Sequence, residues 1–134
     1  MEKLCVPVQI RFADVDMSRH VHNAVYLHWF ELARVTYFRR FISFDHDWLS
    51  QGLILARNEV DYRQPVLFTD EIEVEVWCSA LGKKSIGMRY AVLRKGDRPG
   101  ICAEGRSVLV CYNANDASSI EIPAHWRTAL EGYM

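Results

Sequence analysis

The spacing of apolar side chains changes near residues 24 and 53 and divides the chain into strand-like and helix-like segments. Residues 4–12 alternate and favour β-branched types, which predicts a first strand. From residue 24 to residue 41, bulky apolar residues recur every three or four positions with charged residues between them. This period predicts a long amphipathic helix capped by Asn23. The stripe expected to face the core consists of Tyr26, Phe30, Ala33, Tyr37 and Phe41.

Beyond Gly52 the alternation with period two returns. Strands are predicted at residues 54–62, 71–78, 86–92 and 101–112, and a short helix at residues 123–132. On the first of these strands, Ile54, Ala56, Asn58, Val60 and Tyr62 are expected to share one face. One-sided alternation is typical of an antiparallel sheet with one covered face, and the long helix is the available cover. The pattern predicts an α+β domain: a five-stranded antiparallel sheet, with its last four strands in a meander, wrapped around one long central helix.

Length, composition and charge indicate one ordinary globular domain, residues 1–134. Half of the residues are hydrophobic, a quarter are charged and the net charge is −1, so no nucleic-acid partner is expected. No segment approaches the roughly 20 apolar residues of a membrane span, and the first residues do not resemble a signal peptide. The four cysteines are far apart in the sequence and lack the close pairing of a zinc site or a redox motif. We therefore expect a cytoplasmic protein without a membrane span, a metal or another cofactor.

Titratable side chains crowd the ten residues before the long helix, which read DVDMSRHVHN. Free backbone N–H groups at a helix N-terminus carry partial positive charge and stabilise a negative oxygen. Such an oxygen forms when a thioester or other acyl carbonyl is attacked, and the amide near Asn23 is a candidate donor to it. Asp14 and Asp16 are candidates for the carboxylate that attacks the carbonyl or activates water.

Two other interpretations of this segment stay open. Asp, Ser and Asn before a helix are ordinary turn and capping residues, and His20 and His22 are then hydrogen-bonded loop residues. Alternatively, Asp14, Asp16, His20 and His22 form a metal site, although no downstream pair offers the spacing that would complete it. Within the helix, Glu31 and Arg34 are expected to form a surface pair.

The stretch from Phe12 to Arg34 resembles the signature of the hotdog-fold acyl-CoA thioesterases of the 4-hydroxybenzoyl-CoA thioesterase family. That signature has an aromatic residue, a D-x-D pair, a loop reading H-V-N-N or similar, a tyrosine and an F-E-x-A-R run. Each element is present in register, as Asp14-Val15-Asp16, His20-Val21-His22-Asn23, Tyr26 and Phe30-Glu31-Leu32-Ala33-Arg34. The likeness continues through residues 60–65, 70–76 and 105–108, so it spans nearly the whole chain.

The resemblance implies a thioesterase acting on an acyl-CoA or acyl-carrier-protein thioester. It implies that Asp16 is the nucleophile or general base, that the Asn23 amide polarises the carbonyl, and that His20 assists, as in fatty acyl-carrier-protein thioesterases. Arg19, His22 and Pro65 depart from the family pattern and weaken the His20 assignment, but not the Asp16 assignment. The resemblance also implies a homo-oligomer, either a dimer or a dimer of dimers.

Further residues are candidates for substrate binding, each with an ordinary alternative. Asn58 is polar on an otherwise apolar strand face, and Tyr26 and His22 lie near the helix entrance; all three have alternative packing or hydrogen-bonding roles. The turn Lys83-Lys84-Ser85 is expected to meet the phosphates of coenzyme A, or else to be a solvated tip. It is not a phosphate-binding loop, because Trp77 stands where that motif needs its first glycine.

Two other functions remain open from the sequence. A hotdog hydratase or dehydratase carries a D-x-N-x-x-H run, which this chain does not contain. A non-catalytic module that only binds acyl thioesters would keep the fold and the pocket. The presence of Asp16 beside a helix entrance favours the thioesterase.

Overall fold

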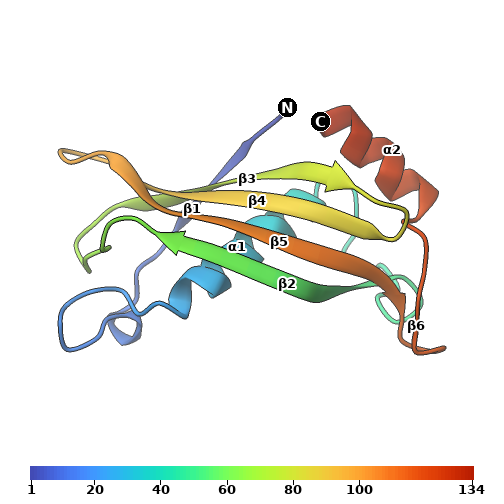
Figure 1. Ribbon diagram of the computed structural model, residues 1–134, viewed down its shortest axis with the longest axis horizontal. Helices are drawn as coiled ribbons and strands as arrows, with labels where there is room; N and C mark the ends of the chain where they lie inside the picture. Colours follow the sequence, from blue (N-terminus) through green and yellow to red (C-terminus); the bar gives the residue numbers. More distant parts are fainter.

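The computed structural model describes residues 1–134 and contains an antiparallel sheet with a long helix across one face (Figure 1). The strands are β1 (Leu4–Val8), β2 (Gly52–Tyr62), β3 (Ile72–Leu81), β4 (Ser85–Arg94), β5 (Gly100–Asn113) and β6 (Ser118–Ser119). The helices are α1 (Val25–Phe38), α2 (Ala124–Tyr133) and a 3-10 turn, η1 (Phe12–Asp14). Neither α-helix has the length and apolar character needed to cross a membrane.

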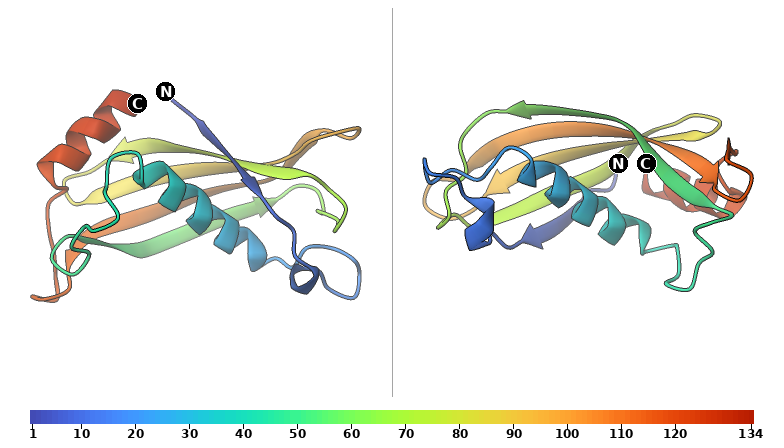
Figure 2. Two further views of the ribbon diagram at one scale, coloured as in Figure 1. Left: turned by 180° about the vertical axis from the view of Figure 1, so that it is seen from behind. Right: turned by 90° about the horizontal axis from the view of Figure 1, so that it is seen from below.

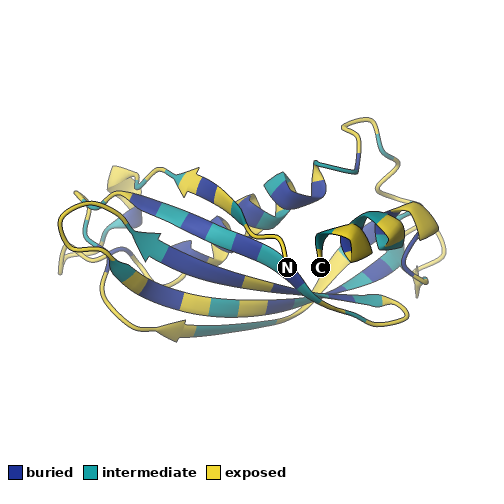
Figure 3. Ribbon diagram, turned by 90° about the horizontal axis from the view of Figure 1, so that it is seen from above, coloured by how far each residue is buried: buried dark blue, intermediate teal, exposed yellow.

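The sheet curves over α1, with the helix on its concave side (Figure 2). This confirms the predicted α+β arrangement, although the sheet has six strands rather than five because two residues of β6 pair with β5. The two chain ends lie side by side, where the Glu2 N–H donates to the Tyr133 carbonyl over 2.7 Å. Buried and exposed residues alternate along the central strands, as expected for a sheet with one covered face (Figure 3).

The strand order is β1-β3-β4-β5-β2, which corrects the predicted four-strand meander. Only β3, β4 and β5 follow one another as neighbours; β2 lies at the far edge and pairs with β5. The predicted meander would have paired β2 with the next strand along the chain, β3. The actual partner is decided by which strand completes the sheet over α1, and this is a long-range choice that local sequence does not encode.

A β-bulge between Leu55 and Arg57 changes which residues of β2 face the helix. The predicted shared face from Ile54 to Tyr62 is therefore wrong in its first half, and Ile54 is 44% exposed. Leu55 instead pairs with Leu109, and Asn58 with Ser107. A bulge adds one residue to a strand, so every side chain before it moves to the other face.

Helix α1 buries the predicted stripe but has different ends. Tyr26, Phe30, Ala33 and Tyr37 are all buried, whereas the regular helix ends at Phe38 instead of residue 41. Asn23 does not cap it: the N-cap residue is Ala24, which makes no side-chain capping bond. The Nδ1 atom of His22 accepts the Ala24 N–H over 3.2 Å and satisfies this donor instead.

The middle of α1 packs against the sheet through the ring of Phe30. This ring is fully buried and stacks on Tyr90, with 4.3 Å between the ring centroids. Gly105 lies beneath it, and a Cβ atom there would overlap the Phe30 ring. The absence of a side chain at Gly105 therefore allows the helix to approach the sheet this closely.

The segment between β1 and α1 is held by a buried carboxylate. Asp14 is 2% exposed, and its oxygens accept the Arg11 backbone N–H over 2.8 Å and the Arg11 guanidinium over 2.8 and 3.1 Å. Beyond it, Val15 bridges to Val21 and His20 to Leu67, which fixes the loop against the β2–β3 connection. Arg19 takes a left-handed conformation with φ 65°, where glycine is the least strained residue.

We predict that Asp14→Asn destabilises the protein by about 1.5–3 kcal/mol at pH 7, because charge-assisted bonds to a buried group are lost. Hydrogen bonding from Arg11 lowers the pKa of Asp14 below its ordinary value of 3.8. A carboxyl group whose pKa is lower in the folded state than in the unfolded state stabilises the protein at pH values above the unfolded-state pKa. This stabilisation is lost as the pH falls through the folded-state pKa. Urea unfolding from pH 7 to pH 2 should show the difference between wild type and variant shrinking below about pH 4.

Asp97→Asn, in an exposed turn, is the matched control and should unfold like wild type at every pH. A difference for Asp14→Asn that stays constant down to pH 2 would contradict the assignment of the effect to the charged form.

Candidate active site

A cleft of about 440 Å³ lies at the N-terminal end of α1. Its walls come from the loop before α1, from the first turn of the helix and from the end of β2 with the residues that follow. It is lined by Asp16, His20, Val21, His22, Asn23, Tyr26, Tyr62, Arg63, Gln64 and Pro65. The fold thus brings together five residues singled out from the sequence: Asp16, His20, His22, Asn23 and Tyr26.

The carboxylate of Asp16 is exposed in the isolated chain and uses only one of its oxygens to hold the loop. Oδ1 accepts the Ser18 N–H over 2.8 Å and the His20 N–H over 3.2 Å. The Asp16 N–H in turn donates to the His20 carbonyl over 2.9 Å. Oδ2 accepts no hydrogen bond from the chain, so it is available to a ligand or water in the cleft.

The entrance of α1 leaves backbone N–H groups without an acceptor, among them that of Asn23, which lines the same cleft as Asp16. The N–H groups of Ala24 and Val25 are both satisfied by His22, through Nδ1 at 3.2 Å and the carbonyl at 3.0 Å. The Asn23 N–H donates to no group in the chain. It lies at the positive end of the helix dipole, where a developing negative oxygen is stabilised.

Two tyrosines fix the position of this entrance. The Tyr62 hydroxyl donates to the Asn23 carbonyl over 3.0 Å and so connects the end of β2 to the start of α1. The rings of Tyr62 and Tyr26 pack edge to face, 5.0 Å apart. Burial raises the pKa of Tyr26 to about 12, so this side chain is neutral near pH 7. The sequence did not indicate Tyr62 as a site residue, because no local motif shows that the end of β2 lies beside the start of α1.

The two histidines of the loop differ in their contacts. His22 acts through Nδ1 as an acceptor for the helix, which requires that this nitrogen carry no proton. The His20 imidazole makes no hydrogen bond within the chain, while its backbone is held by Asp16 and by the bridge to Leu67. His20 is therefore the histidine whose ring is free to meet a ligand.

An arginine network supports the far wall of the cleft. Arg94 donates to the Gln64 side chain over 2.5 Å and to the Pro65 carbonyl over 3.3 Å. Asp70, which is largely buried, lies 3.8 Å from Arg94 and accepts the Leu67 N–H over 2.9 Å. These contacts fix the chain between β2 and β3, which forms that wall.

The remaining predicted residues lie away from this cleft. Asn58 is further back on β2, where its Oδ1 accepts the Ser107 hydroxyl over 2.5 Å. Lys83, Lys84 and Ser85 lie at the β3–β4 turn, ten strand residues from the end of β3 nearest the cleft. Lys83 pairs with Glu121 over 3.3 Å, and Lys84 donates to the Ser119 hydroxyl over 3.1 Å. Within one chain, none of these three residues meets a ligand bound at Asp16.

No group of three or more His, Cys, Asp or Glu side chains in the structure is arranged to hold a metal ion. Asp14 and Asp16 are only two positions apart, but the 3-10 turn ends at Asp14, so the two side chains have different surroundings. One is buried against Arg11, and the other faces the cleft. The cleft therefore combines one free carboxylate oxygen with one free backbone donor, a pair suited to the attack on an acyl carbonyl.

Comparison with known proteins places this architecture in a family. A family model described as the thioesterase-like superfamily matches residues 10–130. YsmA, an uncharacterized protein of Bacillus subtilis (strain 168), is 27% identical over 113 residues, covering 84% of this chain and 75% of that protein.

Solved structures agree with this match. A thioesterase from Thermus thermophilus, solved with coenzyme A and Zn, is 36% identical, with a TM-score of 0.83 over 96% of this chain and 92% of that one. The PA5185 protein of Pseudomonas aeruginosa PAO1 is 27% identical, with a TM-score of 0.86 over 98% and 91% of the two chains. The fold is the hotdog fold, and the chain belongs to the thioesterase-like superfamily of thioester hydrolases.

Proposed function

We propose that the protein hydrolyses an acyl-CoA or acyl-carrier-protein thioester in the cleft at the entrance of α1. The observation that carries this proposal is that the free Oδ2 of Asp16 and the N–H of Asn23, which has no acceptor, belong to residues that line one cleft. The relative from Thermus thermophilus, which was solved with coenzyme A, supports a coenzyme A thioester in particular.

In this proposal the thioester oxygen accepts the Asn23 N–H, which polarises the carbonyl and stabilises the oxyanion. One such preorganised donor lowers a barrier by about 3–4 kcal/mol. As a general base, Asp16 takes a proton from water while the water oxygen attacks the carbonyl carbon. The C–S bond then breaks, and the thiolate leaves with that proton as a free thiol.

As a nucleophile, Asp16 itself attacks the carbonyl carbon, expels the thiolate and forms an acyl anhydride that water then hydrolyses. The free Oδ2 serves either route. Single turnover in water labelled with ¹⁸O tests the nucleophilic route, because water that opens the anhydride at the aspartyl carbon leaves the label in Asp16 and none in the product. Label in Asp16 after one turnover therefore identifies the nucleophile, whereas the general-base route places the label in the product alone.

The sheet edge formed by β2 supports a homodimer. β2 has 11 residues and pairs on one side only, so its other side presents a long row of unpaired backbone groups. Antiparallel pairing of two β2 strands about a two-fold axis would satisfy these groups and join two sheets into one. Packing of two such dimers would give the tetramer.

We predict that Asp16→Asn keeps the fold and lowers kcat by about 10²-fold or more, because the amide neither attacks the carbonyl nor accepts a proton. The amide oxygen still accepts the Ser18 and His20 N–H groups, so the melting temperature should stay close to that of wild type. A panel of acyl-CoA esters, assayed by release of free thiol, measures the rate, and Asp97→Asn is the control. Full activity in Asp16→Asn would refute the assigned role, and an inactive wild type across the panel would favour a binding module.

His20→Ala tests the weaker assignment. If the free imidazole assists proton transfer, the variant loses about 10²-fold in kcat and its pH–rate profile loses one limb. His20→Gln, which keeps a polar side chain, should not restore the rate. An unchanged kcat with an unchanged pH profile would give His20 a purely structural place in the loop.

Light scattering coupled to size-exclusion chromatography should give twice or four times the chain mass of 15.6 kDa. Ile54→Lys, on the edge strand β2, should shift the protein toward the single-chain mass, because charge on an edge strand opposes pairing. A wild-type protein that elutes and scatters as one chain would overturn the dimer.

A further inference from the structure

One side chain in the cleft wall that follows β2 carries hydrogen-bond donors that nothing in the chain uses. Gln64 lines the same cleft as Asp16 and Asn23, and it is exposed to solvent in the isolated chain. Its Oε1 atom accepts the Arg94 guanidinium over 2.5 Å, whereas its Nε2 atom donates to no group in the chain. This wall therefore offers a ligand the N–H groups of one side-chain amide.

The contact with Arg94 determines which end of the Gln64 amide is available to a ligand. A guanidinium only donates hydrogen bonds, so the amide atom that meets it must be the oxygen. The amide cannot turn over without placing its own N–H groups against those of Arg94. Gln64 therefore acts as a donor toward a ligand in the cleft, rather than as an acceptor that would orient a water molecule.

Arg94 is itself held in place on the side of the sheet that faces α1. It pairs across strands with Ile72, which is 2% exposed, and directly paired residues of neighbouring strands point to the same face. Its guanidinium also donates to the Arg98 carbonyl over 2.6 Å and lies 3.8 Å from the Asp70 carboxylate. Only 10% of the Arg94 side chain is exposed, so Gln64 has a fixed partner.

The backbone of Gln64 is also fixed, and its amide group packs against a residue without a side chain. The N–H groups of Arg63 and Gln64 both donate to the Cys102 carbonyl, over 2.8 and 3.1 Å. A Cβ atom at Gly100 would lie 3.4 Å from each polar atom of the Gln64 amide. Because the donor is already in place, a ligand that uses it does not have to order a free side chain.

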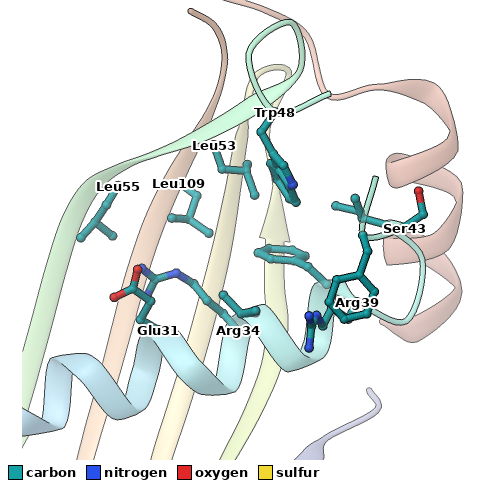
Figure 4. Close-up of a pocket in the computed structure, with 12 residues that line it drawn as sticks. Glu31, Arg34, Arg39, Ser43, Trp48, Leu53, Leu55 and Leu109 are labelled. Atoms are coloured by element: carbon teal, nitrogen blue, oxygen red, sulfur yellow. The ribbon is translucent and has the colours of Figure 1, made fainter. Parts of the chain in front are cut away.

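The mainly apolar cavity of about 460 Å³ beside the second half of α1 differs from this cleft (Figure 4). Glu31 and Arg34 both line it, but they do not form the surface pair expected from the sequence. A carboxylate and a guanidinium in one cavity favour no single kind of ligand group. The Gln64 amide, in contrast, favours one kind, an oxygen that accepts hydrogen bonds.

The position of Gln64 indicates which part of a thioester meets this donor. Val21 and Tyr26 are buried and form the inner part of the cleft, whereas Gln64 lies at its exposed rim. An acyl chain is favoured where it leaves water, so the thiol part of the substrate crosses the rim. In coenzyme A and in acyl carrier proteins this part is the same pantetheine arm. Its first amide lies two carbons from the sulfur, and the carbonyl oxygen of that amide accepts hydrogen bonds.

We propose that Gln64 is a specificity-determining residue whose Nε2 atom donates to the carbonyl oxygen of the first amide of the pantetheine arm. Arg94 sets the direction of this donor without touching the substrate. Gln64 then selects thioesters whose leaving thiol carries an amide at that position, whatever the acyl group. The inference rests on the proposed thioesterase function, and it needs neither a particular acyl group nor the dimer.

The test compares thioesters of one acyl group that differ only in the leaving thiol. N-acetylcysteamine carries the first amide of the arm, and pentanethiol has the same chain length without an amide. Gln64→Met should lower kcat/KM for the N-acetylcysteamine thioester by about threefold to tenfold, the effect of one hydrogen bond, and leave the pentyl thioester unchanged. Equal losses for both thioesters, or no loss for either, would overturn the proposal.

Gln64→Glu separates the donor from the fold. Its carboxylate still accepts the Arg94 guanidinium, and more strongly because it is charged, so the melting temperature should not fall. It has no N–H to donate, so the preference for N-acetylcysteamine should be lost as in Gln64→Met. Gln9→Met, at an exposed position outside the cleft, is the control and should match wild type. A preference that survives in Gln64→Glu would contradict the assigned donor.

Arg94→Met tests whether Arg94 sets the direction of the amide. Without the guanidinium, the Gln64 amide is free to rotate, and kcat/KM for the N-acetylcysteamine thioester should fall relative to the pentyl thioester. A purely structural defect would lower both rates by the same factor and would remove Arg94 from the proposal.

Direct binding separates failure of this inference from failure of the proposed function. S-hexyl-coenzyme A is a thioether that has the whole pantetheine arm and no thioester carbonyl to hydrolyse. Calorimetry should give a Kd about threefold to tenfold higher for Gln64→Met than for wild type. This difference would stand even if no thioester were hydrolysed. Equal Kd values, or no binding to wild type, would overturn the inference while leaving any measured hydrolysis intact.

Discussion

The close contact of Phe30 with the sheet sets the geometry on which both ends of α1 depend. The ring stacks on Tyr90 and occupies the space that a side chain at residue 105 would fill. With its middle fixed, a 14-residue helix of about 21 Å has its two ends placed as well. The N-terminal end then meets the end of β2 at the cleft, and the second half of the helix lines a mainly apolar cavity of about 460 Å³ (Figure 4). A helix seated further from the sheet would open both spaces and separate Tyr62 from Asn23.

Around the helix entrance, most hydrogen-bonding groups are committed to structure, and the few that are not define the candidate chemistry. His22 satisfies two helix amides, Tyr62 occupies the Asn23 carbonyl, and Asp14 is neutralised by Arg11. The groups without a partner include one oxygen of Asp16, the N–H of Asn23 and the ring of His20, all from residues that line the cleft. Preorganisation of this kind matters because donors that are already fixed cost no reorganisation when charge develops.

The sequence by itself determined which segments are strands or the long helix, apart from the two residues of β6, and with them the α+β class and the family resemblance, because hydrophobic period and short motifs are local properties. The helix stripe through Phe30 and the crowded segment from Asp14 to Asn23 were both visible there. It did not determine that β2 joins β5, that a bulge at Leu55 reverses the face of half a strand, or that His22 rather than Asn23 satisfies the first helix amide.

Nor did the sequence separate Asp14, buried against Arg11, from Asp16, which lines the cleft. Only the tertiary structure decided these points, because burial, strand partner and hydrogen-bond partner depend on residues far away in the chain. Two aspartates with the same local sequence preferences differ once one of them is buried against an arginine and the other faces a cleft.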